Sequence, residues 1–106
     1  MGWFGVRTFY RFAARVGGHD AYEERVVLFE AVDADAAIAK AEIEAAGYVT
    51  LLEDGEALPC FQSFRMFDEP GEGAEVFSLI RTSDLAADAY IDRFFDTGTE
   101  FQREVD

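Results

Sequence analysis

The segment from Tyr22 to Val32, which reads YEERVVLFEAV, constrains the fold of this chain more than any other stretch. Its charged start is followed by β-branched and aromatic side chains, which are typical of a buried strand. The residues GGHDA at 17–21 precede it and the residues DAD at 33–35 follow it, so we expect a turn before it and a helix after it. The rest of the chain should be arranged around a core strand at these positions.

The preceding segment, Trp3–Val16, carries mostly apolar side chains at even positions and arginines at odd positions, which is the period of a strand with one buried face. A tight loop at 17–21 would return the chain antiparallel as a hairpin. The expected register pairs Val16 with Tyr22, Arg15 with Glu23, Phe12 with Val26 and Tyr10 with Leu28. A slip of one residue would turn over the apolar face of one strand, so this register predicts which side chains meet.

The element after this hairpin is predicted to be a helix that runs to about Ala46. Either Asp33 or Asp35 can accept hydrogen bonds from its first amides, and Gly47 can end it in a left-handed conformation. Continuation beyond the glycine is the alternative. Small alanine side chains recur at helical spacing and would allow close approach to a sheet.

Two further strands are predicted at 57–68 and 74–82, joined by a second hairpin loop. A last helix should begin at Ser83-Asp84, with Ser83 as its cap, and end at Thr97-Gly98. The expected fold class is therefore α+β, with an antiparallel four-stranded sheet from two hairpins and two helices in the order ββαββα. Residues 1–106 would form a single domain, with 99–106 as a candidate frayed tail.

The charge balance excludes some classes of partner. Nine basic and 22 acidic residues give a formal net charge of −13, which disfavours both the phosphate contacts of nucleic-acid binding and an anionic membrane surface. No apolar run reaches spanning length, we expect no signal peptide, and the lone Cys60 fits a reducing compartment. We expect a cytoplasmic protein with Cys60 as a buried, inert thiol.

No catalytic, cofactor-binding or metal-binding residue is predicted. His19 could act as a general base beside Asp20, but there is no second histidine and no recognisable nucleophile motif, so an exposed loop residue is the better interpretation. The acids at 68–75 lack the ligand spacing of a calcium loop. We expect no cofactor.

An acidic row is the more unusual feature of the last predicted helix. Its members are Asp84, Asp88, Asp92 and Asp96. Like charges at this i+4 spacing are mildly destabilising, each by a few tenths of a kcal/mol. Arginines within the chain could offset them, or a basic protein partner could dock there; a solvated face is the simpler interpretation.

Apolar side chains are predicted on both faces of the sheet. Two short helices on one side would leave the other face too apolar to remain in water. We therefore expect a homodimer, with a dimer or partner face formed by Phe9, Val27, Phe29, Phe61, Phe67, Phe77 and Leu79.

Three arginines on the predicted strands support an alternative. Arg7, Arg11 and Arg25 could hold an anionic group in an aromatic-lined cleft, which would make the chain a small-ligand binder or a cryptic enzyme. Arginines on strands more often pair with nearby acids.

Several short segments are spread across nearly the whole chain: Trp3-Phe4 with Arg7, Tyr22–Ala31, Ala41-Glu42, Glu75–Ser78 and Arg81. Together they resemble a small bacterial family known as domain of unknown function 4288. The resemblance implies a stand-alone bacterial cytoplasmic domain of about this length, and no activity, catalytic residue or cofactor. The leading expectation is a non-enzymatic acidic protein-interaction domain, regulatory or toxin-neutralising, that acts as a homodimer.

Overall fold

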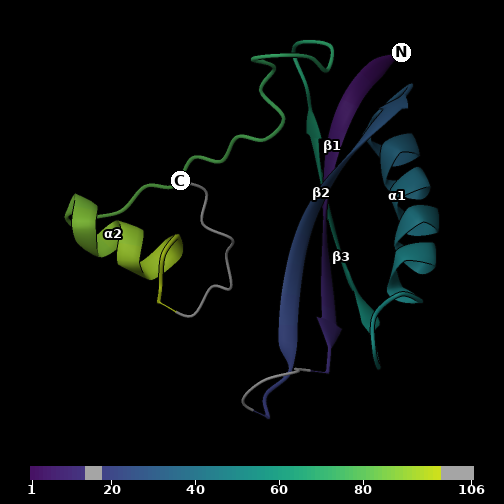
Figure 1. The fold of residues 1–106 in the computed structure, drawn as a ribbon. Helices are drawn as coiled ribbons and strands as arrows, with labels where there is room; N and C mark the ends of the chain where they lie inside the picture. Colours follow the sequence, from purple (N-terminus) through teal and green to yellow (C-terminus); the bar gives the residue numbers. More distant parts are fainter. Residues whose placement is uncertain (14–17, 99–106) are drawn as a thin grey trace.

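The computed structural model describes residues 1–13 and 18–98, which form three strands and two helices (Figure 1). The elements are β1 (Gly2–Phe12), β2 (Ala21–Ala31), α1 (Ala34–Val49), β3 (Glu56–Arg65) and α2 (Ala87–Phe94). All strands are antiparallel, in the order β2-β1-β3, so β1 is the central strand and β2 lies at an edge. The predicted α+β class with an antiparallel sheet is retained, but the four-stranded ββαββα arrangement is wrong.

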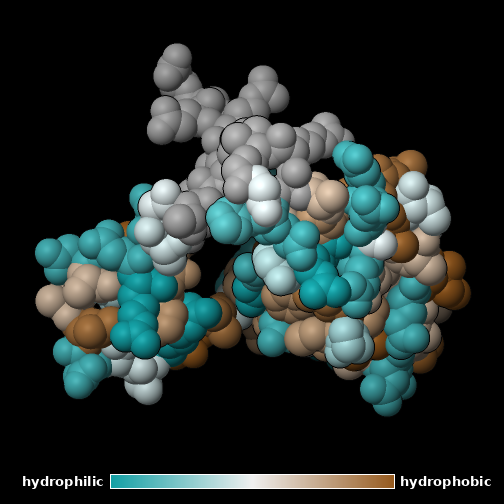
Figure 2. Space-filling view, turned by 90° about the horizontal axis from the view of Figure 1, so that it is seen from below, coloured by the Kyte–Doolittle hydropathy of each residue, from teal (hydrophilic) through white to brown (hydrophobic). Residues whose placement is uncertain are grey.

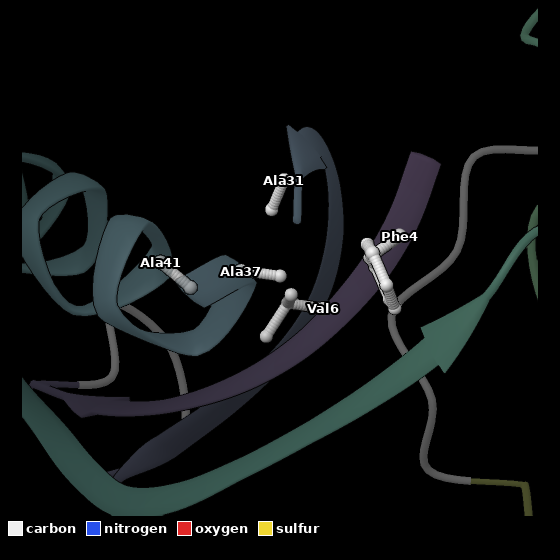
Figure 3. Close-up of a cluster of buried hydrophobic side chains, with 5 residues drawn as sticks. All are labelled: Phe4, Val6, Ala31, Ala37 and Ala41. Atoms are coloured by element: carbon white, nitrogen blue, oxygen red, sulfur yellow. The ribbon is translucent and has the colours of Figure 1, made fainter. Parts of the chain in front are cut away.

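The hydrophobic core lies between α1 and one face of the sheet. Even-numbered residues of β1 point to this face, and Phe4 and Val6 are buried there against Ala31, Ala37 and Ala41 (Figure 3). Small side chains on α1 let the helix approach the strands closely, as the alanine stripe predicts. We call this the first face, and the opposite side of the sheet the second face.

The expected hairpin forms, but with a different register. Phe12 lies opposite Ala21 and Tyr10 opposite Glu23, not opposite Val26 and Leu28. The described pairing ends with Phe12 opposite Ala21, whereas the predicted tight loop at 17–21 would have continued it to Val16 and Tyr22. The predicted and observed registers differ by an odd number of residues. Odd-numbered residues of β2 therefore share the first face with even-numbered residues of β1. The predicted strand end at 14–16, including its pairs of Arg15 and Val16, lies outside the described residues.

Helix α1 begins as predicted and ends later than predicted. The carboxylate of Asp33 accepts a hydrogen bond from the amide of Ala36 at 2.8 Å, which satisfies a first-turn donor. The helix then continues through Gly47 to Val49, so Gly47 is not its terminator. Tyr48 is thereby held on the helix and can reach the sheet.

The predicted fourth strand at 74–82 does not form. This segment has no strand pairing and instead crosses the second face, where Phe77 packs edge-on against Phe64 with ring centroids 4.7 Å apart. Gly5 permits the crossing, since a Cβ at this residue would lie 2.7 Å from the carbonyl oxygen of Val76. Packing on the sheet has therefore overridden the strand propensity of the segment.

Helix α2 begins at Ala87, later than the predicted start at Ser83, and stands clear of the sheet (Figure 1). Within the described part of the chain it contacts none of the other four elements. Neither described helix is long and apolar enough to cross a membrane. Cys60 is exposed on β3 and not buried as predicted, because it lies where an irregularity shifts the pairing of this edge strand with β1.

Candidate functional site

The second face of the sheet is only partly covered. Phe77 covers the part nearest β3, where the guanidinium carbon of Arg7 lies 5.4 Å from the centre of its ring and 5.1 Å from that of Phe9. Among residues 1–13 and 18–98, no aromatic side chain covers the part nearest β2 in this way. There Val26 and Tyr22 are 40% and 66% exposed. Apolar surface thus remains accessible beside the crossing segment.

The chain then leaves the sheet as an arm, which we define as residues 79–95. It runs from the second face to α2, and its apolar side chains remain accessible to solvent: Leu79, Ile80, Leu85, Ile91, Phe94 and Phe95. Figure 2 shows the side chains of α2 as a separate group beside the rest of the molecule, with apolar surface on it. The apolar side chains of α2 therefore pack on no other element of the described residues.

The seven residues predicted as a dimer or partner face do not form one surface. Val27, Phe29 and Phe61 belong to the first face; Phe29 and Phe61 are half-buried against the core cluster beneath α1. Phe9 and Phe77 lie on the second face. The other two members of the set, Phe67 and Leu79, are exposed beyond the sheet. The register shift explains the position of Val27 and Phe29, because it exchanges the two faces of β2, while Phe67 and Leu79 lie outside the three strands.

Each of the three candidate anion-binding arginines already has a carboxylate partner. Arg7 is paired with Glu24, Arg11 with Glu56 and Arg25 with Glu44. The hydrogen bond that Arg11 donates to Glu56 raises the pKa of Arg11 above its usual value. Since each positive charge is neutralised within the chain, the arrangement does not favour recognition of an anionic ligand.

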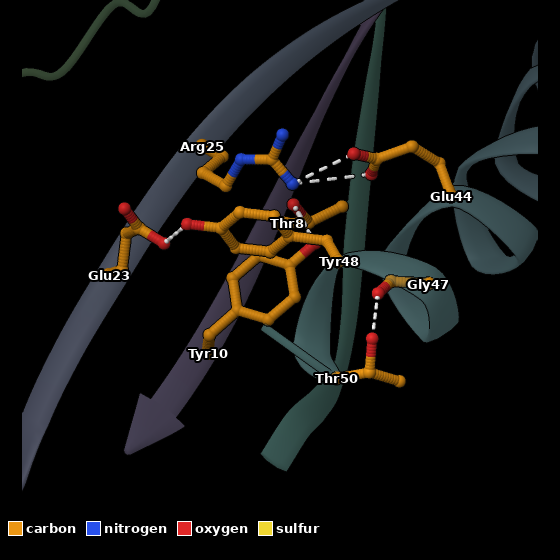
Figure 4. Close-up of polar contacts among 8 residues, drawn as sticks. All are labelled: Thr8, Tyr10, Glu23, Arg25, Glu44, Gly47, Tyr48 and Thr50. Atoms are coloured by element: carbon orange, nitrogen blue, oxygen red, sulfur yellow. Dashed lines mark hydrogen bonds and ion pairs between the residues drawn. The ribbon is translucent and has the colours of Figure 1, made fainter. Parts of the chain in front are cut away.

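A polar cluster lies between α1 and the sheet (Figure 4) and joins Arg25 to Glu44 and Tyr48, which the sequence does not single out. Arg25 lies over the ring of Tyr48, with 3.5 Å between the guanidinium carbon and the ring centre, and forms an ion pair with Glu44 at 2.9 Å. The hydroxyl of Tyr48 donates a hydrogen bond to Glu23. Its ring meets that of Tyr10 edge-on at 5.0 Å. These contacts fix the end of α1 on the sheet.

The cluster changes the acidity of two of its members. The hydrogen bond to Glu23, reinforced by burial, raises the pKa of Tyr48 above the usual tyrosine value. Burial works to lower the pKa of Arg25, but the hydrogen bond to Glu44 helps to raise it, and the net result is a raised pKa. Charged Arg25 and neutral Tyr48 are thus the favoured forms, which suits a structural contact.

The four aspartates of the acidic row are all exposed. Asp88 and Asp92 lie on α2, while Asp84 precedes it and Asp96 follows it. None of the ion pairs found among the described residues includes them. Arg81 and Arg93 instead lie over the ring of Phe94, with guanidinium carbons 4.9 and 5.7 Å from its centre. The row therefore has no charge partner in this part of the chain.

One open groove lies where β3 ends. It has a volume of about 330 Å³ and lies between residues 64–67 and the crossing segment 75–78. Its polar side chains, Arg65, Glu75 and Ser78, lie among aromatic and aliphatic ones. None of the three candidate anion-binding arginines lines it.

His19 is exposed, as expected of a loop residue. Among residues 1–13 and 18–98 there is no group of three or more His, Cys, Asp or Glu side chains placed to hold a metal ion. Comparison of the chain with family models, curated proteins and solved structures finds no match. The resemblance to domain of unknown function 4288 thus stays a prediction.

Proposed function

We propose that this chain is a protein-interaction domain that acts as a homodimer and buries its arm in the dimer interface. The observation that carries the proposal is the exposure of large apolar side chains on the arm, such as Ile80 at 89% and Phe95 at 65%, while α2 contacts none of the other described elements. Obligate homodimer interfaces are rich in apolar side chains of this kind. The composition of the arm is therefore suited to burial against a second copy.

The composition of the arm also supports an interface. Large aliphatic and aromatic side chains form the centre of protein interfaces, whereas acidic ones favour the rim. The arm has both kinds, since Ile91 on α2 and Phe95 at its end are accessible close to Asp88 and Asp92 of the same helix. The acidic row would stay in solvent at the edge of the dimer, where a basic protein partner could bind it.

Substitutions in α2 test the proposal against a matched control. Ile91→Asp with Phe95→Asp should weaken dimerisation by at least about 10-fold, because it places charges in the buried part of the interface. Ile43→Asp is the control, since Ile43 is equally apolar and 77% exposed but lies on α1. Light scattering during gel filtration gives the mass of each variant. Equal masses for the two α2 substitutions and the control would contradict the proposal.

A further inference from the structure

The uncovered part of the second face and the apolar side of α2 are matched in size. From Tyr22 to Val26 a strand spans about 14 Å, and the eight residues of α2 form a helix about 12 Å long. Residues 87, 91 and 94 follow the spacing of one helix face, with Phe95 beside it. A single short helix can therefore cover the exposed part of β2.

The charges of the second face permit an apolar helix to dock. Glu24 lies within the uncovered area, between Tyr22 and Val26, and its charge is compensated by Arg7; Arg11, opposite Tyr22, is paired with Glu56. The aspartates of α2 lie on the flank of its apolar side, about 100° further round the helix, so they can stay in water when that side is buried. Docking thus leaves no carboxylate buried without a partner.

We propose that the arms are exchanged: α2 of each chain covers the second face of its partner, beside β1 and β2. The inference rests on the proposed homodimer and specifies its contacts. The arm carries α2 away from its own sheet (Figure 1), and α2 contacts no other element of its own chain among the described residues. A reciprocal exchange covers both second faces and both helices at once, as twofold symmetry requires.

Cross-linking between two differently tagged chains tests the exchange. Both chains carry Cys60→Ser, which removes the exposed native thiol. One also carries Val26→Cys and the other Ile91→Cys, at positions that are 40% and 45% exposed, so folding should be retained. The chains are mixed, refolded together and treated with a short bis-maleimide. We expect a covalent product that contains both tags and has twice the mass of one chain.

A single variant that carries both Val26→Cys and Ile91→Cys is then cross-linked on its own. It distinguishes docking of α2 on the partner's sheet from docking on its own sheet. At low concentration, cross-links within one chain only would overturn the exchange and show that α2 returns to its own sheet. A dimeric mass without a link between positions 26 and 91 would also overturn it, while leaving the proposed homodimer intact. A monomeric mass would overturn both. Tyr22→Cys with Phe95→Cys provides a second pair, and failure of both pairs in a folded dimer would decide against the exchange.

Discussion

Arg25 joins the two layers of this molecule at the level of single residues. It extends from β2 on the first face, stacks on Tyr48 of α1 and pairs with Glu44 of the same helix. Arginine suits this position because its planar guanidinium can stack and donate hydrogen bonds at the same time. The same cluster includes the buried hydroxyl of Thr8, which donates a hydrogen bond to that of Tyr10 at 2.9 Å. The end of α1 is thus fixed by polar contacts and its centre by alanines.

The raised pKa of Tyr48 predicts a specific loss of stability in alkali. Its folded pKa is raised above the unfolded value of about 10, so its contribution is fully present below pH 10 and is lost as the pH rises through the folded pKa. Tyr48→Phe should lower the free energy of unfolding by about 1 kcal/mol at neutral pH, and this difference should shrink above pH 10. Urea unfolding at several pH values measures it. Tyr90→Phe, on α2, is the control, and a difference for Tyr48→Phe that does not change with pH would contradict the account.

Among the predicted elements, the segment at 74–82 differs most from the structure that its sequence predicts. Its apolar residues predict a strand, but a strand also needs a free edge at the right distance, which a local pattern cannot specify. The loop after β3 instead leads it across the second face, where Val76 and Phe77 pack on Gly5 and Phe64. The sheet then has three strands, with β3 at its edge.

Gly5→Ala tests that crossing. The new Cβ would lie 2.7 Å from the carbonyl oxygen of Val76, so either the segment or β1 must shift. We expect the free energy of unfolding to fall by about 1–3 kcal/mol. Gly47→Ala is the matched control; it lies within α1 with open space around it, and should raise stability by about 0.5–1 kcal/mol. If Gly5→Ala proves as stable as the unsubstituted chain in urea unfolding, the segment does not cross the face.

The sequence predicts elements better than their arrangement. Helix α1 and its cap Asp33 follow from local chemistry, and the three strands follow from their apolar patterns. The register does not, because a period of two defines only alternate faces and the length of the loop decides which residues pair. The proposed interface is the part that the sequence predicts least. The exposure of Ile91 and Phe95 depends on where α2 lies relative to the sheet, and no pattern within the helix specifies its position.

At the scale of the whole molecule, charge opposes the association that apolar surface favours. Each chain has a formal charge of −13, so two copies repel each other, whereas salt screens this repulsion. A homodimer held by the arms should therefore be as stable or more stable at higher salt. A complex between the acidic row and a basic protein should weaken under the same conditions, which distinguishes the two kinds of partner.

The mass of the unmodified chain in solution tests the central claim most directly. Sedimentation equilibrium at micromolar concentration and physiological salt should give twice the 11.8 kDa of one chain, and the same or a larger dimeric fraction when salt is added. A mass of 11.8 kDa across the concentration series would contradict the homodimer, and with it the burial of the arm by a second copy.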